Sequence, residues 1–148
     1  MMSMDREHLV LMMEAGYIYM GMQRYKEARE VFEGLTVLAP ESDVPWVALG
    51  GVAFCEGNFK EAKKVYEKAL KMTPESLYAK AYLAETLFFM KEKEESVRLM
   101  KEVSHADRGA VGDFARAFLD AVNKGFDPET LSGVKVVKEY HEKKRAKS

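Results

Sequence analysis

Residues 46–74 read WVALGGVAFCEGNFKEAKKVYEKALKMTP, and this stretch decides the fold of the chain. A shift of 34 residues places it on an earlier stretch with small, aromatic and proline residues at the same positions. The matching pairs are Gly16 with Gly50, Ala28 with Ala62, Phe32 with Tyr66, Leu35 with Ala69 and Pro40 with Pro74. Self-similarity at a fixed period of this length indicates a repeat protein, so we expect function in a groove and not in a catalytic pocket.

Each unit is expected to form two antiparallel helices joined by a tight turn. Steps of 34 residues give three units within a single domain of residues 1–148, at about 9–42, 43–76 and 77–110. Gly50 and Ala62 lack bulk, so the paired helices can approach closely, while Tyr66 fills the space toward their neighbours. Gly57 suits the turn because glycine adopts a left-handed backbone, and Pro74 ends the second helix.

The third unit and the residues after it keep less of the pattern. Lys93, Ser96 and Arg108 stand where the first two units have an aromatic residue, an alanine and a proline. Residues 111–123 predict a seventh helix outside the repeated pairs. Residues 128–144 predict a C-terminal helix that caps the array, because the last unit of a solenoid otherwise leaves an apolar face in water. The valines of this segment leave a strand as the alternative.

The second unit resembles the tetratricopeptide repeat, whose pattern combines a large residue, Leu-Gly, small residues, aromatic residues and a final proline. The matching residues are Trp46, Leu49, Gly50, Ala62, Tyr66, Ala69 and Pro74, whereas Ala53 stands where the pattern has tyrosine. The resemblance implies an all-α fold, an α-solenoid of three helical hairpins followed by the seventh helix and the capping helix. It also implies a concave groove lined by the first helix of each hairpin.

Composition and charge exclude several classes of function. The 148 residues include 23 basic and 24 acidic side chains, so no field of one sign indicates a nucleic-acid partner. The single cysteine, Cys55, cannot form an intramolecular disulfide, which fits a cytoplasmic protein. The apolar run from Leu9 to Met22 is shorter than the roughly 20 residues that span a bilayer, so we expect no membrane insertion.

Residue patterns that carry catalysis or bind metals do not emerge from the sequence. Three scattered histidines and Cys55 do not have the spacing of metal ligands, and the glycines inside helical patterns do not form a phosphate-binding loop. No serine or cysteine sits in a recognisable nucleophile motif. We therefore expect no catalytic residue, no metal and no cofactor, and a protein that is not an enzyme.

The resemblance implies which side chains face the groove. Those expected to contact a partner are Met13, Tyr17, Met20, Val47, Phe54, Tyr78, Tyr82 and Phe88. Glu14 and Glu85 are the charged residues among the inward-facing positions. Repeats that resemble the Hsp70 and Hsp90 co-chaperones hold a terminal carboxylate with Lys, Asn and Arg, and those residue types are missing here. Met, Tyr and Phe instead favour an apolar or amphipathic segment of a client protein, helical or extended.

Three repeats with a tyrosine-rich groove resemble the type III secretion chaperones, which bind translocator proteins or the needle subunit in the bacterial cytosol. Translocator chaperones carry a longer helical extension before the first repeat, so the short segment before Leu9 favours the needle-subunit type. That type implies a small co-chaperone as a further partner, and apolar grooves also leave a homodimer open. The alternative is a generic adaptor that holds folded partners within a multiprotein complex.

Overall fold

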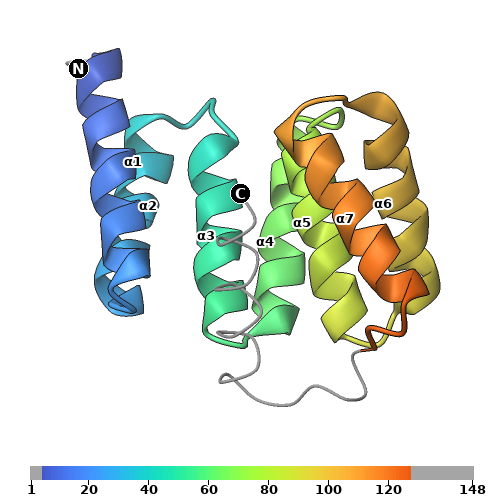
Figure 1. The fold of residues 1–148 in the computed structure, drawn as a ribbon. Coiled ribbons are helices and arrows are strands. Elements are labelled where there is room, and N and C mark those ends of the chain that lie inside the picture. The colour runs from blue at the N-terminus through green and yellow to red at the C-terminus, as the bar shows by residue number, and fades with distance from the viewer. Residues whose placement is uncertain (1–4, 128–148) are drawn as a thin grey trace.

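A computed structural model describes residues 5–127, which form seven α-helices and contain no β-strand. The helices pair in sequence order and stack side by side into one array (Figure 1). Their bounds are α1 (Arg6–Gly21), α2 (Tyr25–Leu38), α3 (Val44–Cys55), α4 (Phe59–Met72), α5 (Leu77–Phe89), α6 (Lys93–Ala106) and α7 (Ala110–Asn123). The predicted all-α solenoid is confirmed, while the capping helix predicted at about 128–144 lies outside the described residues.

One hydrogen-bonded turn recurs every 34 residues along the array. The backbone N–H of Arg24, Asn58, Glu92 and Phe126 donates to the carbonyl oxygen of Tyr19, Ala53, Leu87 and Ala121 respectively, at 2.9, 2.9, 2.9 and 3.0 Å. The residue before each donor has a positive φ: 63° at Gln23, 80° at Gly57, 68° at Lys91 and 99° at Gly125. The fourth turn follows α7, so this helix ends in the same turn as the first helices of the three repeats.

Small residues on the first helices make room for large residues on the second. A Cβ atom added to Gly50 would lie 2.6 Å from Cδ1 of Tyr66, and one added to Gly16 would lie 2.5 Å from Cζ of Phe32. Real Cβ atoms do not approach other atoms this closely. The rings of Phe32 and Tyr66 therefore occupy the space that a side chain on either glycine would need, and this contact sets the spacing of the first two hairpins.

The core runs through the array as two adjoining clusters. One cluster joins α1 to α4 and contains Phe32, Leu35 and Val52, which are all buried. The other joins α3 to α7 and contains Phe88 and Met100. Each helix contacts mainly its neighbours in sequence, which is typical of a solenoid.

The two ends of the described array differ in polarity. Leu11 and Ile18 on α1 are 60% and 63% exposed, whereas Val52 and Thr86, one and two repeats beyond Ile18, are fully buried. At the other end, α7 turns a polar side to solvent. The exposed residues of that side include Asp113, Arg116, Asp120 and Asn123. The array thus ends in an apolar surface at α1 and a polar surface at α7.

Candidate partner-binding groove

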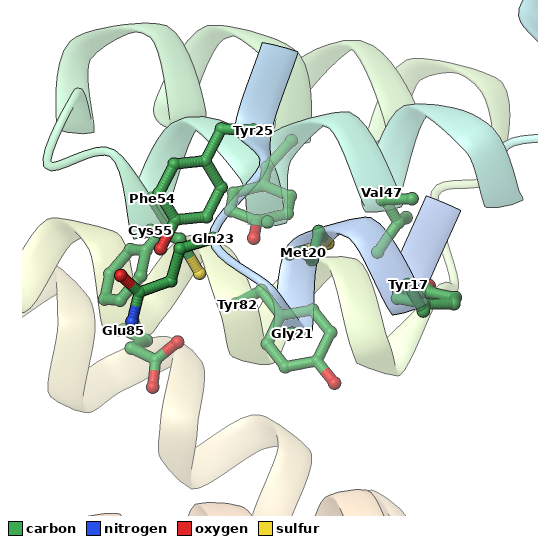
Figure 2. A pocket seen from close by; sticks show the side chains of 13 residues that line it. Tyr17, Met20, Gly21, Gln23, Tyr25, Val47, Phe54, Cys55, Tyr82 and Glu85 are labelled. Carbon is green, nitrogen blue, oxygen red and sulfur yellow. The ribbon is translucent and has the colours of Figure 1, made fainter. Parts of the chain in front are cut away.

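The first helices α1, α3 and α5 line a groove of about 440 Å³ on one side of the array. Figure 2 shows the side chains that converge on it from these three helices and from the turn after α1. The lining residues are Tyr17, Met20, Gly21, Gln23, Tyr25, Val47, Ala48, Gly51, Phe54, Cys55, Tyr66, Tyr82 and Glu85. Most of them are apolar or aromatic, so the groove suits an apolar surface.

Gly51 on α3 makes room for Tyr66 of α4 at the groove. A Cβ atom at Gly51 would lie 3.5 Å from Cε of Met20 and 3.9 Å from the hydroxyl oxygen of Tyr66. Because Gly51 has no side chain, the hydroxyl end of Tyr66 reaches the groove from α4, although its ring is packed in the core. The two consecutive glycines thus have separate roles, since Gly50 makes room for the ring of Tyr66 and Gly51 lies next to its hydroxyl.

Tyrosines on α4 and α5 form a continuous series of ring contacts beside the groove. The ring centroid of Tyr82 lies 6.0 Å from that of Tyr66, 6.2 Å from Tyr78 and 6.1 Å from Phe114. Aromatic rings at these separations attract one another beyond the effect of buried area alone. These contacts run from Tyr66 on α4 through Tyr82 on α5 to Phe114 on α7.

A single carboxylate sets the charge of the groove. Glu85 is 2% exposed and is the one charged residue among the described residues that line the groove. Burial, and secondly the charge of Glu85, raise the pKa of Tyr82 to about 12 and raise the pKa of Tyr66 well above its usual value. Burial also raises the pKa of Tyr17. All three hydroxyls therefore stay protonated at neutral pH and can donate hydrogen bonds to a bound chain.

The structure brings together five of the eight residues predicted for the groove, namely Tyr17, Met20, Val47, Phe54 and Tyr82. Phe54 is 1% exposed and packs against Phe59 and Phe89, so only the edge of its ring borders the groove. The other three residues lie elsewhere. Met13 packs at the border of the first core cluster. Tyr78 is 52% exposed at the rim, where it contacts Tyr82.

The prediction that Phe88 faces a partner is wrong. Its side chain is fully buried, and its ring centroid lies 5.1 Å from those of Phe118 and Phe126. Successive residues of a helix diverge by about 100°, so Phe88 and Phe89 cannot share one direction. The sequence of α5 does not show which of its two apolar sides α7 covers.

Three lining residues were missed by the sequence reasoning, which considered first helices alone. Gln23 belongs to the turn after α1, Tyr25 begins α2, and Tyr66 lies on α4. The sequence did contain a signal for Tyr66, namely the two consecutive glycines at positions 50 and 51. Two adjacent residues of α3 without side chains leave room for a large side chain of α4. Of the two acidic residues expected to face inward, Glu85 lines the groove, and Glu14 does not belong to its lining.

The described residues, 5–127, contain no membrane-spanning helix and no cluster of metal ligands. None of the helices described there combines the length and apolarity needed to cross a membrane. Across the same residues, no group of three or more His, Cys, Asp or Glu side chains could hold a metal ion.

Comparisons with known proteins define the class first. The tetratricopeptide repeat family matches residues 10–42 with one of its sequence profiles and residues 53–117 with another. The contact of Gly16 with Phe32 and the first three of the recurring turns described above fall within these matches. The chain therefore belongs to the tetratricopeptide repeat family.

Among curated proteins, the mouse protein O-mannosyl-transferase TMTC1 is 34% identical over 58 residues. That match covers 39% of this chain and 6% of the mouse protein, so the chain spans only a small part of that relative.

Solved structures with a similar fold include two bacterial secretion chaperones. The type III secretion translocator chaperone SycD of Yersinia enterocolitica has a TM-score of 0.71 at 17% identity, over 79% of this chain and 91% of SycD. PcrH of Pseudomonas aeruginosa has a TM-score of 0.70 at 17% identity, over 81% of this chain and 95% of PcrH. SycD has been solved with a peptide of the translocator YopD, and PcrH with the chaperone binding region of PopD.

A third similar structure is the first repeat domain of Spaghetti (RPAP3) bound to the HSP90 peptide SRMEEVD. It has a TM-score of 0.66 at 16% identity, over 83% of this chain and 99% of that domain. At these identities the likeness to all three structures concerns the fold. The chain is thus a tetratricopeptide repeat protein that resembles both secretion chaperones and a binder of an acidic peptide.

Proposed function

We propose that the groove holds an apolar or amphipathic segment of a client protein, and that the chain acts as a cytoplasmic type III secretion chaperone rather than an enzyme. The observation that carries this proposal is the lining of the groove, where aromatic and aliphatic side chains surround one buried carboxylate. Covering apolar side chains contributes about 1.5–3 kcal/mol each, against association costs of roughly 4–15 kcal/mol. Five covered side chains therefore support micromolar to nanomolar binding.

The lining also distinguishes between the two kinds of neighbour. SRMEEVD carries acidic residues at its C-terminal end, whereas Glu85 gives the groove a negative charge with no Lys, Arg or His among its described lining residues. Like charges in a weakly hydrated groove repel, so an acidic terminus is disfavoured. The complexes of SycD and PcrH with translocator segments support the chaperone role more than the Spaghetti complex does.

Binding of defined peptides tests the groove. Fluorescently labelled chaperone binding region of PopD and labelled SRMEEVD would be titrated with the chain, and anisotropy would be recorded. We expect the PopD segment to bind at least about tenfold more tightly, and Tyr17→Ala with Tyr82→Ala to weaken that binding by a further factor of about ten. Val37→Ala, which truncates an apolar side chain that is 77% exposed on α2 outside the groove, is the matched control.

Two outcomes would contradict the proposal. Tighter binding of SRMEEVD would place the chain with binders of acidic termini. Unchanged binding of the PopD segment by the double tyrosine variant would remove the groove as the site.

The secretion role needs a separate measurement in the native organism. The tagged chain and its double tyrosine variant would be used for affinity capture from lysate, with mass spectrometry of the eluted proteins. Enrichment of a translocator or a needle subunit by the unmodified chain, and its loss in the variant, supports the chaperone. Capture of a folded multiprotein assembly that persists in the variant would favour the alternative, a generic adaptor.

A further inference from the structure

The last described residues pack close to one end of the groove. The ring of Phe126 stacks on Phe88 at 5.1 Å and lies 6.4 Å from Phe89. The ring of Phe89 in turn lies 5.4 Å from Phe54, which borders the groove. Two ring contacts therefore connect the last described residues to the border of the groove.

The residues after Asp127 are not needed to close the array. The outward side of α7 is already polar, which is what the end of a solenoid requires. The position held by Gly16, Gly50 and Ala84 in the first three units is held by Phe118 in the fourth. Phe118 is buried, and Phe126 packs near its ring at 6.4 Å. A second helix packed as closely as α2 and α4 would need a small residue at this point.

Residues 128–148 have the chemistry that the groove favours. Their sequence is PETLSGVKVVKEYHEKKRAKS, with Leu131, Val134, Val137 and Tyr140 at intervals of three residues. Six Lys or Arg residues against three Glu residues make the segment basic, whereas the rest of the chain carries 17 basic and 21 acidic residues. An apolar series with positive charge matches an apolar groove whose charged lining residue is Glu85.

We propose that residues 128–148 occupy the groove of their own chain and are displaced by the client. This proposal rests on the groove being the client site. A helix of 21 residues is about 30 Å long, and three first helices packed about 8–10 Å apart span roughly 20 Å, so the segment can cross the groove. A tethered segment has a millimolar effective concentration, so even an intrinsic dissociation constant of about 0.1 mM weakens client binding about tenfold.

The chain contains its own reporter of groove occupancy. Cys55 is the single cysteine, and it lines the groove. Its rate of reaction with 5,5′-dithiobis(2-nitrobenzoic acid) would be measured in the full chain, in Val134→Asp with Val137→Asp, and in Thr130→Asp with Ser132→Asp. The second variant adds the same charge and leaves the apolar series intact. We expect the first variant to react about tenfold faster and the control to react as the unmodified chain does.

A labelled peptide of residues 128–148 provides the second test. It should bind the Val134→Asp, Val137→Asp variant about tenfold more tightly than the unmodified chain, and it should slow the reaction of Cys55 in that variant. Equal Cys55 rates in all three proteins, together with equal binding of the peptide, would overturn the proposal. That result leaves the client site itself untouched, because the PopD titration and the tyrosine variants test it separately.

Hydrogen exchange on the unmodified chain keeps the proposal testable if the aspartate variants fail to fold. Peptic fragments from residues 128–148 should exchange faster when the PopD segment is bound than when it is absent. Unchanged exchange in those fragments, with the PopD segment bound, would overturn the occupancy and leave the proposed function standing. Absence of PopD binding in the same experiment would count against the proposed function instead.

Discussion

Gly50 lies so close to the ring of Tyr66 that one added methyl group should change the stability of the array. In Gly50→Ala, the new Cβ would lie 2.6 and 2.7 Å from Cδ1 and Cζ of that ring, where ordinary contact begins at 3.4 Å. The ring is 2% exposed and packs against Tyr82, so it cannot move away without disturbing its contact with α5. Overpacking lowers the free energy of unfolding by about 1–3 kcal/mol, whereas replacing a helical glycine by alanine raises it by up to about 1 kcal/mol.

The expected net loss is about 1–2 kcal/mol in the free energy of unfolding, measured by urea titration followed by circular dichroism. Gly34→Ala is the matched control, because no heavy atom lies within 4 Å of its added Cβ and the same substitution in α2 should stabilise by about 0.5–1 kcal/mol. Adding Tyr66→Leu to Gly50→Ala should recover part of the lost free energy of unfolding, because the two residues are in contact and their effects are therefore not additive. Equal stability changes at positions 50 and 34 would refute the steric argument.

Three other predictions concern the turn, the groove and the open end. Lys91→Gly should stabilise the chain by about 0.5–1 kcal/mol in urea, because its φ of 68° is costly for a residue with a side chain; destabilisation would mean that the turn is not strained. Since burial and the charge of Glu85 raise the pKa of Tyr82 from 10.0 to about 12, the unfolded chain deprotonates first, and the free energy of unfolding should fall as pH rises through that range. Tyr82→Phe should flatten this dependence in urea titrations at successive pH values, and an unchanged slope would assign it to other groups. Leu11→Ser with Ile18→Ser should lower any concentration-dependent association seen by sedimentation while leaving the unfolding transition in place; undiminished association would locate the contact elsewhere.

The fold could be predicted from the sequence because few structures are sterically compatible with its 34-residue repeat. A glycine on one helix and an aromatic residue 16 positions later, repeated after 34 residues, require two helices in close contact, and the contacts of Gly16 with Phe32 and Gly50 with Tyr66 confirm this. The third turn gave a weaker signal. Lys91 takes the left-handed backbone that Gly57 takes in the second unit, and nothing in a lysine indicates it. At this turn the hydrogen bond from the backbone N–H of Glu92 to the carbonyl oxygen of Leu87 identifies the turn, whereas the residue type at position 91 does not.

The groove was less predictable, because α5 is apolar on more than one side. Tyr82 and Phe88 both belong to the aromatic pattern of this helix, yet Tyr82 borders the groove and Phe88 packs beneath α7. The contact of Phe88 with Phe118 joins residues 30 positions apart, and the local sequence around either residue does not encode it. Tyr66 reaches the groove from α4 beside Gly51, and a prediction that considered first helices alone could not include it.

The unequal ends of the described array limit how copies of the chain can add to one another. An open filament needs the head of each subunit to accept the tail of the next, so both surfaces must match. Here the head at α1 exposes Leu11 and Ile18, while α7 presents charged side chains to solvent over residues 110–123. Head-to-tail growth would bury those charges against aliphatic groups, where they would lose their water without gaining polar partners. An association in which two such heads meet uses the same surface on both copies, so it closes at two subunits.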